Sequence, residues 1–154
     1  MPKRFSKNRR IADRKRLQEA EAQVHWAVGG LWSISSVTDE PETVLSGWHV
    51  FEVKLPGKTE RTRHFAGCVD YYREGRASSA IQVFDPATMR GVTESGRTYQ
   101  LTRSRGFTAD GRYTWQQWCR ICSATDIVDV SDEIEAAVAN AGAYESRKAG
   151  NESL

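Results

Sequence analysis

Two groups of residues have the types that could perform catalysis or hold a metal. The first is the pair Cys119 and Cys122, which forms a Cys-x-x-Cys motif. Such a pair can carry out thiol–disulfide chemistry or supply half of a zinc site, although zinc needs two further ligands. Because the pair falls late in an expected amphipathic helix, on the same stripe as two tryptophans, its spacing favours packing in the core.

The second group is His64, Cys68 and Asp70, which fall in one expected strand. Residues at even offsets in a strand share a face, so the three side chains could form a His–Cys–Asp cluster around a nucleophilic thiol. His49 could join His64 and Cys68 as a metal ligand if the strand registers align them, but this spacing matches no known ligand motif. The alternative is that His64 is a half-exposed strand residue beside basic neighbours.

The sequence contains no glycine-rich phosphate loop, no nucleophile elbow and no His-Glu-x-x-His motif. We therefore predict a protein that is not an enzyme and that has no catalytic residue, metal or cofactor. A small hydrolase or a thiol- or metal-dependent enzyme built on the two groups above is kept as an alternative.

Positive charge is concentrated at the N-terminus. Residues 1–16 carry eight basic side chains and one acid, a net charge of +7, whereas the rest of the chain carries 14 basic and 19 acidic side chains, a net charge of −5. Basic arms of this kind often contact nucleic acid or other polyanions; the alternative is a solubilising tail. Together with two arginines of an expected hairpin, the predicted nucleic-acid-binding residues are Lys3, Arg4, Lys7, Arg9, Arg10, Arg14, Lys15, Arg16, Arg61 and Arg63.

Aromatic residues offer a second route to nucleic acid. The chain has five Trp, five Tyr and five Phe, many of them in or beside expected strands. If some lay on an open sheet face near arginines such as Arg61, Arg63, Arg76 and Arg97, they would form a stacking surface for single strands. The favoured alternative is that they fill the core.

Bulk properties limit the class of protein. A chain of 154 residues with 39% hydrophobic residues is typical of one globular domain. No apolar run approaches the roughly 20 residues that a membrane span needs, and the basic N-terminus lacks the apolar stretch of a secretion signal. Three cysteines, an odd number without a regular framework, suit a reducing compartment. We expect a cytoplasmic protein with no membrane partner.

Periodicity predicts an α+β fold. It comprises an N-terminal basic helix, an antiparallel sheet of 5–6 short strands arranged as a meander or curled, and two C-terminal helices. The expected elements are a helix from about Asn8 to Gly29, a short strand at 31–37, a hairpin turning at 56–58, a strand at 79–84, a hairpin turning at 94–97, and helices at 109–122 and 131–144.

The same pattern predicts the domain boundaries. Residues 1–16 form a basic arm that is partly disordered, residues 17–146 form a single α+β domain, and residues 147–154 form a disordered tail. The second half of the N-terminal helix is expected to pack on the domain, because its apolar residues recur at steps of three and four.

The stretch "SSAIQVFDPATMRGVTESGRTYQL", continuing to "YTWQQWCRI", resembles a pattern in small uncharacterised proteins of proteobacterial plasmids, integrative elements and prophages. The resemblance covers roughly residues 47–130 and excludes the basic arm. It implies a bacterial cytoplasm and an accessory role in a mobile element, and it assigns no activity and no functional residue.

We therefore predict a non-enzymatic mobile-element accessory protein that binds nucleic acid, or a nucleoprotein complex, through its basic arm. The alternative is a protein-binding inhibitor of a host defence system, of the anti-restriction or anti-CRISPR type. In that case the partner is a host protein complex, and the acidic body mimics nucleic acid.

Overall fold

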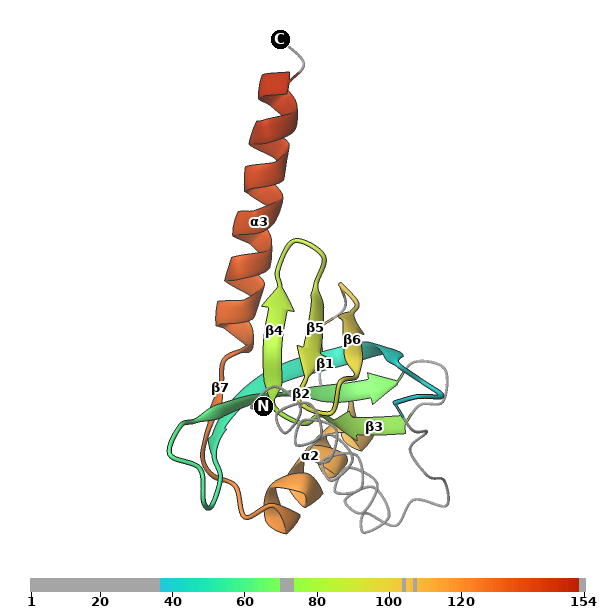
Figure 1. Cartoon of the computed structure of the whole chain (residues 1–154), viewed down its shortest axis with the longest axis vertical. Coiled ribbons are helices and arrows are strands. Elements are labelled where there is room, and N and C mark those ends of the chain that lie inside the picture. The colour runs from blue at the N-terminus through green and yellow to red at the C-terminus, as the bar shows by residue number, and fades with distance from the viewer. Residues whose placement is uncertain (1–36, 70–73, 104, 107, 153–154) are drawn as a thin grey trace, which may run out of the picture.

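The structure, a computed structural model, describes residues 37–69, 74–103, 105–106 and 108–152 (Figure 1). The basic N-terminal helix lies outside the described residues, as does nearly all of the strand expected at 31–37. The described part is an α+β fold, as predicted. Its elements are β1 (Glu42–Lys54), β2 (Thr62–Val69), β3 (Glu74–Ala77), β4 (Ile81–Asp85), β5 (Arg90–Thr93), β6 (Thr98–Leu101), α2 (Ala109–Ile121), β7 (Thr125–Asp129) and α3 (Ser131–Glu152).

The strands form one open sheet in the order β3-β2-β1-β6-β5-β4. Two antiparallel meanders, β1-β2-β3 and β4-β5-β6, lie side by side and are joined where β1 pairs with β6. Both expected hairpins are present. The first turns at Pro56-Gly57, where Gly57 has a φ of +76° and the Lys58 N–H donates to the Leu55 carbonyl at 3.3 Å, as its sequence predicts.

The expectation of an all-antiparallel sheet is wrong at one pairing. β1 runs parallel to β6, with Thr43 opposite Tyr99 and Leu45 opposite Leu101, so the sheet is mixed. The sheet has seven strands within the described residues, more than the five or six expected, because Glu74–Ala77, not expected as a strand, forms β3, and "TDIVD", a strand or loop by its sequence, forms β7. Phe65 of β2 lies 6.1 Å from Phe84 of β4 between ring centroids, although β1, β6 and β5 lie between β2 and β4 in the sheet.

β1 pairs with strands of both meanders because it bends. The register between β1 and β2 shifts between Ser46 and His49, and Gly47 in this bulge has a φ of +52°, a conformation that favours glycine. Before the bulge, β1 pairs with β6; after it, the same edge of β1 pairs with β7, Phe51 lying opposite Asp129.

Apolar residues fill both faces of the sheet. One cluster gathers around Trp48, Phe65 and Tyr99 and includes Ile134 from the start of α3. The other gathers on the opposite face, where Val53 and Ala66 pack beneath Trp115 and Trp118 of α2. The helix thus covers β2 and β3, as Figure 1 shows.

α2 begins one residue after Thr108, whose side-chain oxygen accepts the Gly111 N–H at 3.1 Å. Asp110, the cap expected from the sequence, is instead in the first turn. The helix approaches the sheet closely: a Cβ at Gly75 of β3 would lie 2.3 Å from the Asp110 carbonyl oxygen and 2.2 Å from Thr114 Oγ1. Only glycine allows this contact.

α3 projects from the sheet, with the C-terminus near its tip (Figure 1). Its expected end near Tyr144 is wrong: it continues to Glu152, so residues 147–152, assigned to a disordered tail, are helical. Its first turn contacts the body through a buried side chain and two ion pairs. Ile134 is buried, and Arg105 donates to Asp132 at 2.9 Å and to Glu135 at 2.6 Å.

We predict that Gly75→Ala lowers the free energy of unfolding by about 2–3 kcal/mol, because the added methyl group overlaps backbone atoms of α2. Chemical denaturation measures the change. Gly142→Ala is the matched control: it adds the same atom to a helix where nothing lies within 4 Å, and should stabilise by about 0.5–1 kcal/mol. Equal stability of Gly75→Ala and the original protein would contradict the close contact.

Candidate functional site

Arg61 and Arg63, the two predicted nucleic-acid-binding residues among the described ones, lie at the start of the returning strand of the first hairpin. They line an open cleft of about 600 Å³ between this hairpin and the loops around Ala80 and Glu94. Across its mouth, Lys58 Nζ lies 3.3 Å from Glu94 Oε1. The cleft therefore contains both signs of charge.

Both arginines are bound by carboxylates of the same protein. Arg61 Nε donates to Glu52 Oε2 at 3.0 Å, and Arg63 donates to Glu52 Oε1 at 3.2 Å and to Glu133 at 2.9 Å. Arg61 also donates to the Asp126 carbonyl. These hydrogen bonds, first from Arg61 and then from Arg63, hold the pKa of Glu52 below its usual value. The two charges are thus already compensated within the fold.

The other eight predicted binding residues, the basic side chains of residues 1–16, lie outside the described residues. The structure therefore does not place the arm relative to Arg61 and Arg63.

His64 is buried rather than half-exposed, with 2% of its surface accessible. Its Nδ1–H donates to the Ser78 carbonyl at 2.9 Å, and its Nε2 accepts from Thr62 Oγ1 at 2.7 Å. Its ring centroid lies 4.6 Å from that of Trp118. Burial lowers the pKa of His64 to about 4. Both ring nitrogens are therefore used in holding a neutral imidazole in the core.

The structure brings His64 and Cys68 to the same strand but not into contact. Four strand residues span about 13 Å, so a shared face does not bring the two side chains within hydrogen-bond reach. Asp70 lies outside the described residues. His49 is separated from His64 by Phe51, which is paired with His64 across the strands. Within the described part of the chain, no three potential ligands are grouped to hold a metal.

The Cys-x-x-Cys motif packs as its helical position predicts. Cys119 is buried beneath α2 in the cluster with Trp115 and Trp118, and Cys122 is half-buried beside them. Burial raises the pKa of the Cys119 thiol to about 12 and also raises that of Cys122. Both groups are therefore protonated at neutral pH and poor nucleophiles.

The described aromatic rings do not form a stacking surface on the sheet. Trp48, Phe65 and Tyr99 are buried in one core cluster with residues of β1, β6 and the first turn of α3, and Arg76 and Arg97, expected to lie near such a surface, are buried as well. The outward face of β4 and β5 instead exposes Val83 and Val92. The favoured interpretation, that aromatic residues fill the core, is confirmed for these residues.

Sequence reasoning missed a group made by His49, Asp129 and Ser131. His49 Nδ1 donates to Asp129 Oδ2 at 2.9 Å, Ser131 Oγ donates to Asp129 Oδ1 at 2.5 Å, and the Val50 N–H donates to Ser131 Oγ at 3.0 Å. Burial raises the pKa of Asp129, but the hydrogen bonds from Ser131 and His49 outweigh it and lower the pKa.

This group has the residue types of a catalytic triad but a different geometry. Ser131 is completely buried and gives its proton to Asp129 instead of to His49. Asp129 also accepts the Ser131 N–H at 2.9 Å, at the start of α3. The group therefore fixes the start of α3 against β1. The Asp-x-Ser before the expected last helix was the only part of this group that the sequence signalled. The histidine lies 80 residues away in the sequence, so no local pattern connects it to the other two residues.

A scan against protein-family models, a search of curated proteins and a search of solved structures each find no match to this chain. The functional argument therefore depends on the charges and contacts of its own residues.

We predict that stability falls as pH is lowered from about 6.5 to 4. The pKa of His64 is about 4 in the folded state, below its ordinary value of 6.5, so protonation favours the unfolded chain in this window. The stabilisation is complete above pH 6.5 and decreases by about 3 kcal/mol towards pH 4. Urea unfolding at several pH values measures this. His64→Gln should lose most of the slope; an unchanged slope would contradict the assignment.

We also predict that a thiol-reactive dye at pH 8 labels native Cys119 at least about 100-fold more slowly than denatured Cys119, since a pKa of about 12 leaves little thiolate. Cys68→Ala combined with Cys122→Ala leaves Cys119 as the thiol that the dye reports. Fast labelling of Cys119 in that folded variant would instead favour the thiol-enzyme alternative.

Proposed function

We propose that this protein is a non-enzymatic accessory protein that binds nucleic acid, or a nucleoprotein complex, through its basic N-terminal arm. The observation that carries the proposal is the segregation of charge: +7 in residues 1–16 against −5 in the rest. With a single acid, Asp13, the arm cannot neutralise itself. Phosphates are the natural partners of such a segment, because binding them releases condensed counterions.

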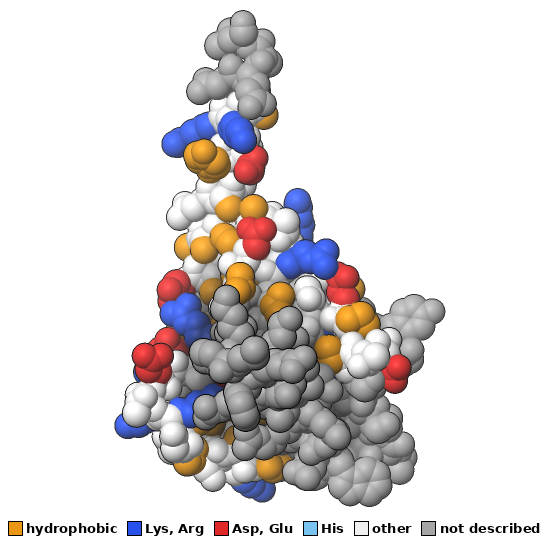
Figure 2. All heavy atoms as spheres, in the orientation of Figure 1, with side chains coloured by type: hydrophobic (Ala, Val, Ile, Leu, Met, Phe, Trp, Pro, Cys, Tyr) orange, Lys and Arg blue, Asp and Glu red, His pale blue; other side chains and the backbone are white. Residues whose placement is uncertain are grey.

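The charges of the described residues, which we call the body, support a binding role for the arm. Acidic and basic side chains are interspersed on the visible face (Figure 2), and several arginines of the body have a carboxylate of their own. The pairs are Arg61 with Glu52, Arg63 with Glu52 and Glu133, Arg90 with Glu42, Arg97 with Glu40, and Arg105 with Asp132 and Glu135. Guanidinium groups compensated in this way gain less from a phosphate than unpaired ones.

The proposed setting is the bacterial cytoplasm and a mobile element, which the resemblance of residues 47–130 implies. Within the described residues, neither helix is long and apolar enough to cross a membrane. The two enzyme alternatives gain no support from the neutral His64 or from the protonated Cys119.

Replacing the eight basic residues of the arm by Gln should abolish most of the salt dependence of nucleic-acid binding. Each phosphate contact contributes about 0.9 to the slope of log K against log salt for duplex DNA, so eight contacts give at most a slope of about −7. Fluorescence anisotropy with a labelled 16-base-pair duplex, from 50 to 200 mM salt, measures the slope.

The paired arginines provide the internal comparison. Arg61→Gln with Arg63→Gln removes two positive charges but only contacts already shared with Glu52 and Glu133, so the slope should change by less than the loss of two arm contacts. Absence of binding at 50 mM salt would overturn the proposal. Capture of a host protein complex after nuclease treatment, without nucleic-acid affinity, would favour the inhibitor alternative.

A further inference from the structure

α2 has one buried side and one exposed side. Trp115, Trp118 and Cys119 face the sheet and are buried. The exposed residues Arg112, Gln116 and Arg120 follow at steps of four along the solvent-facing surface of the helix. With the neighbouring Tyr113, which is 52% exposed, these four residues form a surface that we call the α2 stripe.

The residue types of the α2 stripe suit a phosphate backbone. Arg112 and Arg120 are eight residues apart, which corresponds to about 12 Å along a helix. Their guanidinium groups can each take a phosphate in bidentate fashion. Between them, Gln116 supplies an amide and Tyr113 an exposed ring; both line a shallow open pocket of about 370 Å³ with Arg112 and Ala109. Amides can hydrogen-bond bases, and rings can stack on them.

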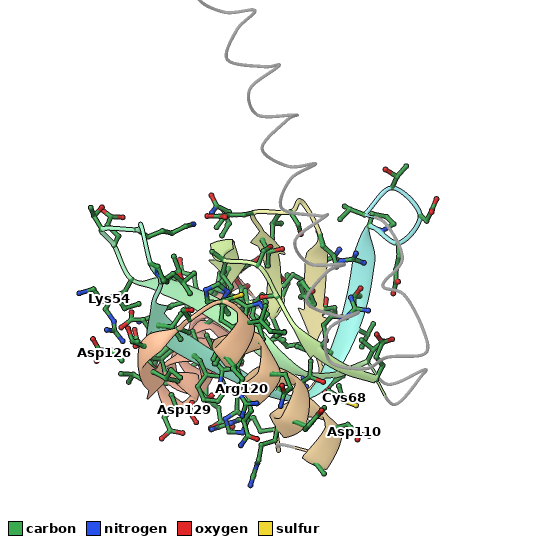
Figure 3. All side chains as sticks on the ribbon, turned by 90° about the horizontal axis from the view of Figure 1, so that it is seen from below. Lys54, Cys68, Asp110, Arg120, Asp126 and Asp129 are labelled. Atoms are coloured by element: carbon green, nitrogen blue, oxygen red, sulfur yellow. The ribbon has the colours of Figure 1, made fainter. Side chains whose placement is uncertain are left out.

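Arg120 differs in its pairing from the arginines of the hairpin and of the loop before α2. In the part of the chain that the structure describes, no carboxylate lies within ion-pair distance of Arg120, in contrast to Arg61, Arg63 and Arg105. The acid of the first turn of α2, Asp110, lies three residues before Tyr113 and so adjoins the N-terminal end of the stripe, ten residues or about 15 Å along the helix from Arg120. Figure 3 labels Arg120 and Asp110 along α2. A polyanion would therefore meet positive charge without displacing a partner of Arg120.

The support beneath the stripe is rigid. Gly75 and Gly111 let the first turns of α2 approach β3 and β2 closely, and the rings of Phe51, Trp115 and Trp118 stack in series at 4.5 and 5.0 Å. The helix therefore fixes the spacing of its arginines before any ligand binds, which reduces the ordering cost of binding.

We propose that the α2 stripe is a second, folded contact surface for nucleic acid: Arg112 and Arg120 bind backbone phosphates, while Tyr113 and Gln116 contact the bases between them. This inference rests on the nucleic-acid binding proposed above and adds a contact that the basic arm does not supply.

The test uses the full chain with Arg112→Gln and Arg120→Gln combined, in anisotropy titrations with a 16-nucleotide single strand and a 16-base-pair duplex. Loss of two phosphate contacts should reduce the magnitude of the salt slope by about 1.8 on duplex and about 1.4 on single strands. Arg90→Gln with Arg147→Gln is the control: it removes the same net charge from β5 and α3 and should leave the slope nearly unchanged. Circular dichroism verifies folding of both variants.

Tyr113→Ala tests the stacking contact separately. We expect it to weaken single-strand binding about tenfold or more, since one stacked base contributes about 1–3 kcal/mol, with a smaller effect on duplex. Preserved α2 in circular dichroism identifies this as a contact effect.

The outcomes separate this inference from the proposed function. If the original protein binds and the arm variant does not, but the double α2 variant keeps the original slope, the α2 inference is overturned while the proposed function stands. An equal slope change in the Arg90/Arg147 control also overturns it, because net charge alone then explains binding. If the α2 variant loses a nuclease-resistant protein partner and keeps its nucleic-acid affinity, the stripe is a protein surface instead. No binding by the original protein overturns both.

Discussion

The bend in β1 is the constraint on which the rest of the fold depends. A straight strand of this length would offer one edge to one neighbour, but the bulge at Gly47 divides that edge between β6 and β7. The parallel pairing with β6 joins the two meanders, and the pairing with β7 delivers the chain to the start of α3. There Ser131 accepts the Val50 N–H, so β1 also fixes the origin of the projecting helix.

A second constraint is the local compensation of charge. The base of α3 carries several carboxylates, and Arg63 and Arg105 reach them from two different parts of the sheet. These pairs are at least partly exposed, so each contributes little to stability. Their larger effect is on function: an arginine that already hydrogen-bonds to Glu52 or Glu133 must exchange one partner for another to bind a phosphate. The pairing therefore lowers what Arg61 and Arg63 would gain from a phosphate.

Local sequence patterns correctly predicted the features that depend only on residues close together in the chain. The turn at Pro56-Gly57, the buried stripe of α2 and the packing of Cys119 follow from neighbouring residues, and the structure confirms them. Pairings between distant segments were not predicted, because periodicity carries no register: the parallel β1–β6 contact and the Arg63–Glu133 pair, 70 residues apart, are examples. The cluster of His64 with Cys68 failed for a different reason, since a shared strand face says nothing about the distance along it.

The sequence shows how many charged residues the candidate site contains, whereas the structure shows which of these residues have partners. Arg61 and Arg120 are both arginines near a predicted turn or helix end, and the sequence does not show which of them has a partner. In the fold, Arg61 is held by Glu52 across the hairpin, and within the described residues Arg120 meets no carboxylate. The difference arises because a strand pair places cross-strand neighbours within hydrogen-bond reach, while an amphipathic helix directs its polar side away from the body. Of these two arginines, the one on the helix is therefore the one without a carboxylate partner among the described residues, and the one in the cleft of the hairpin is paired.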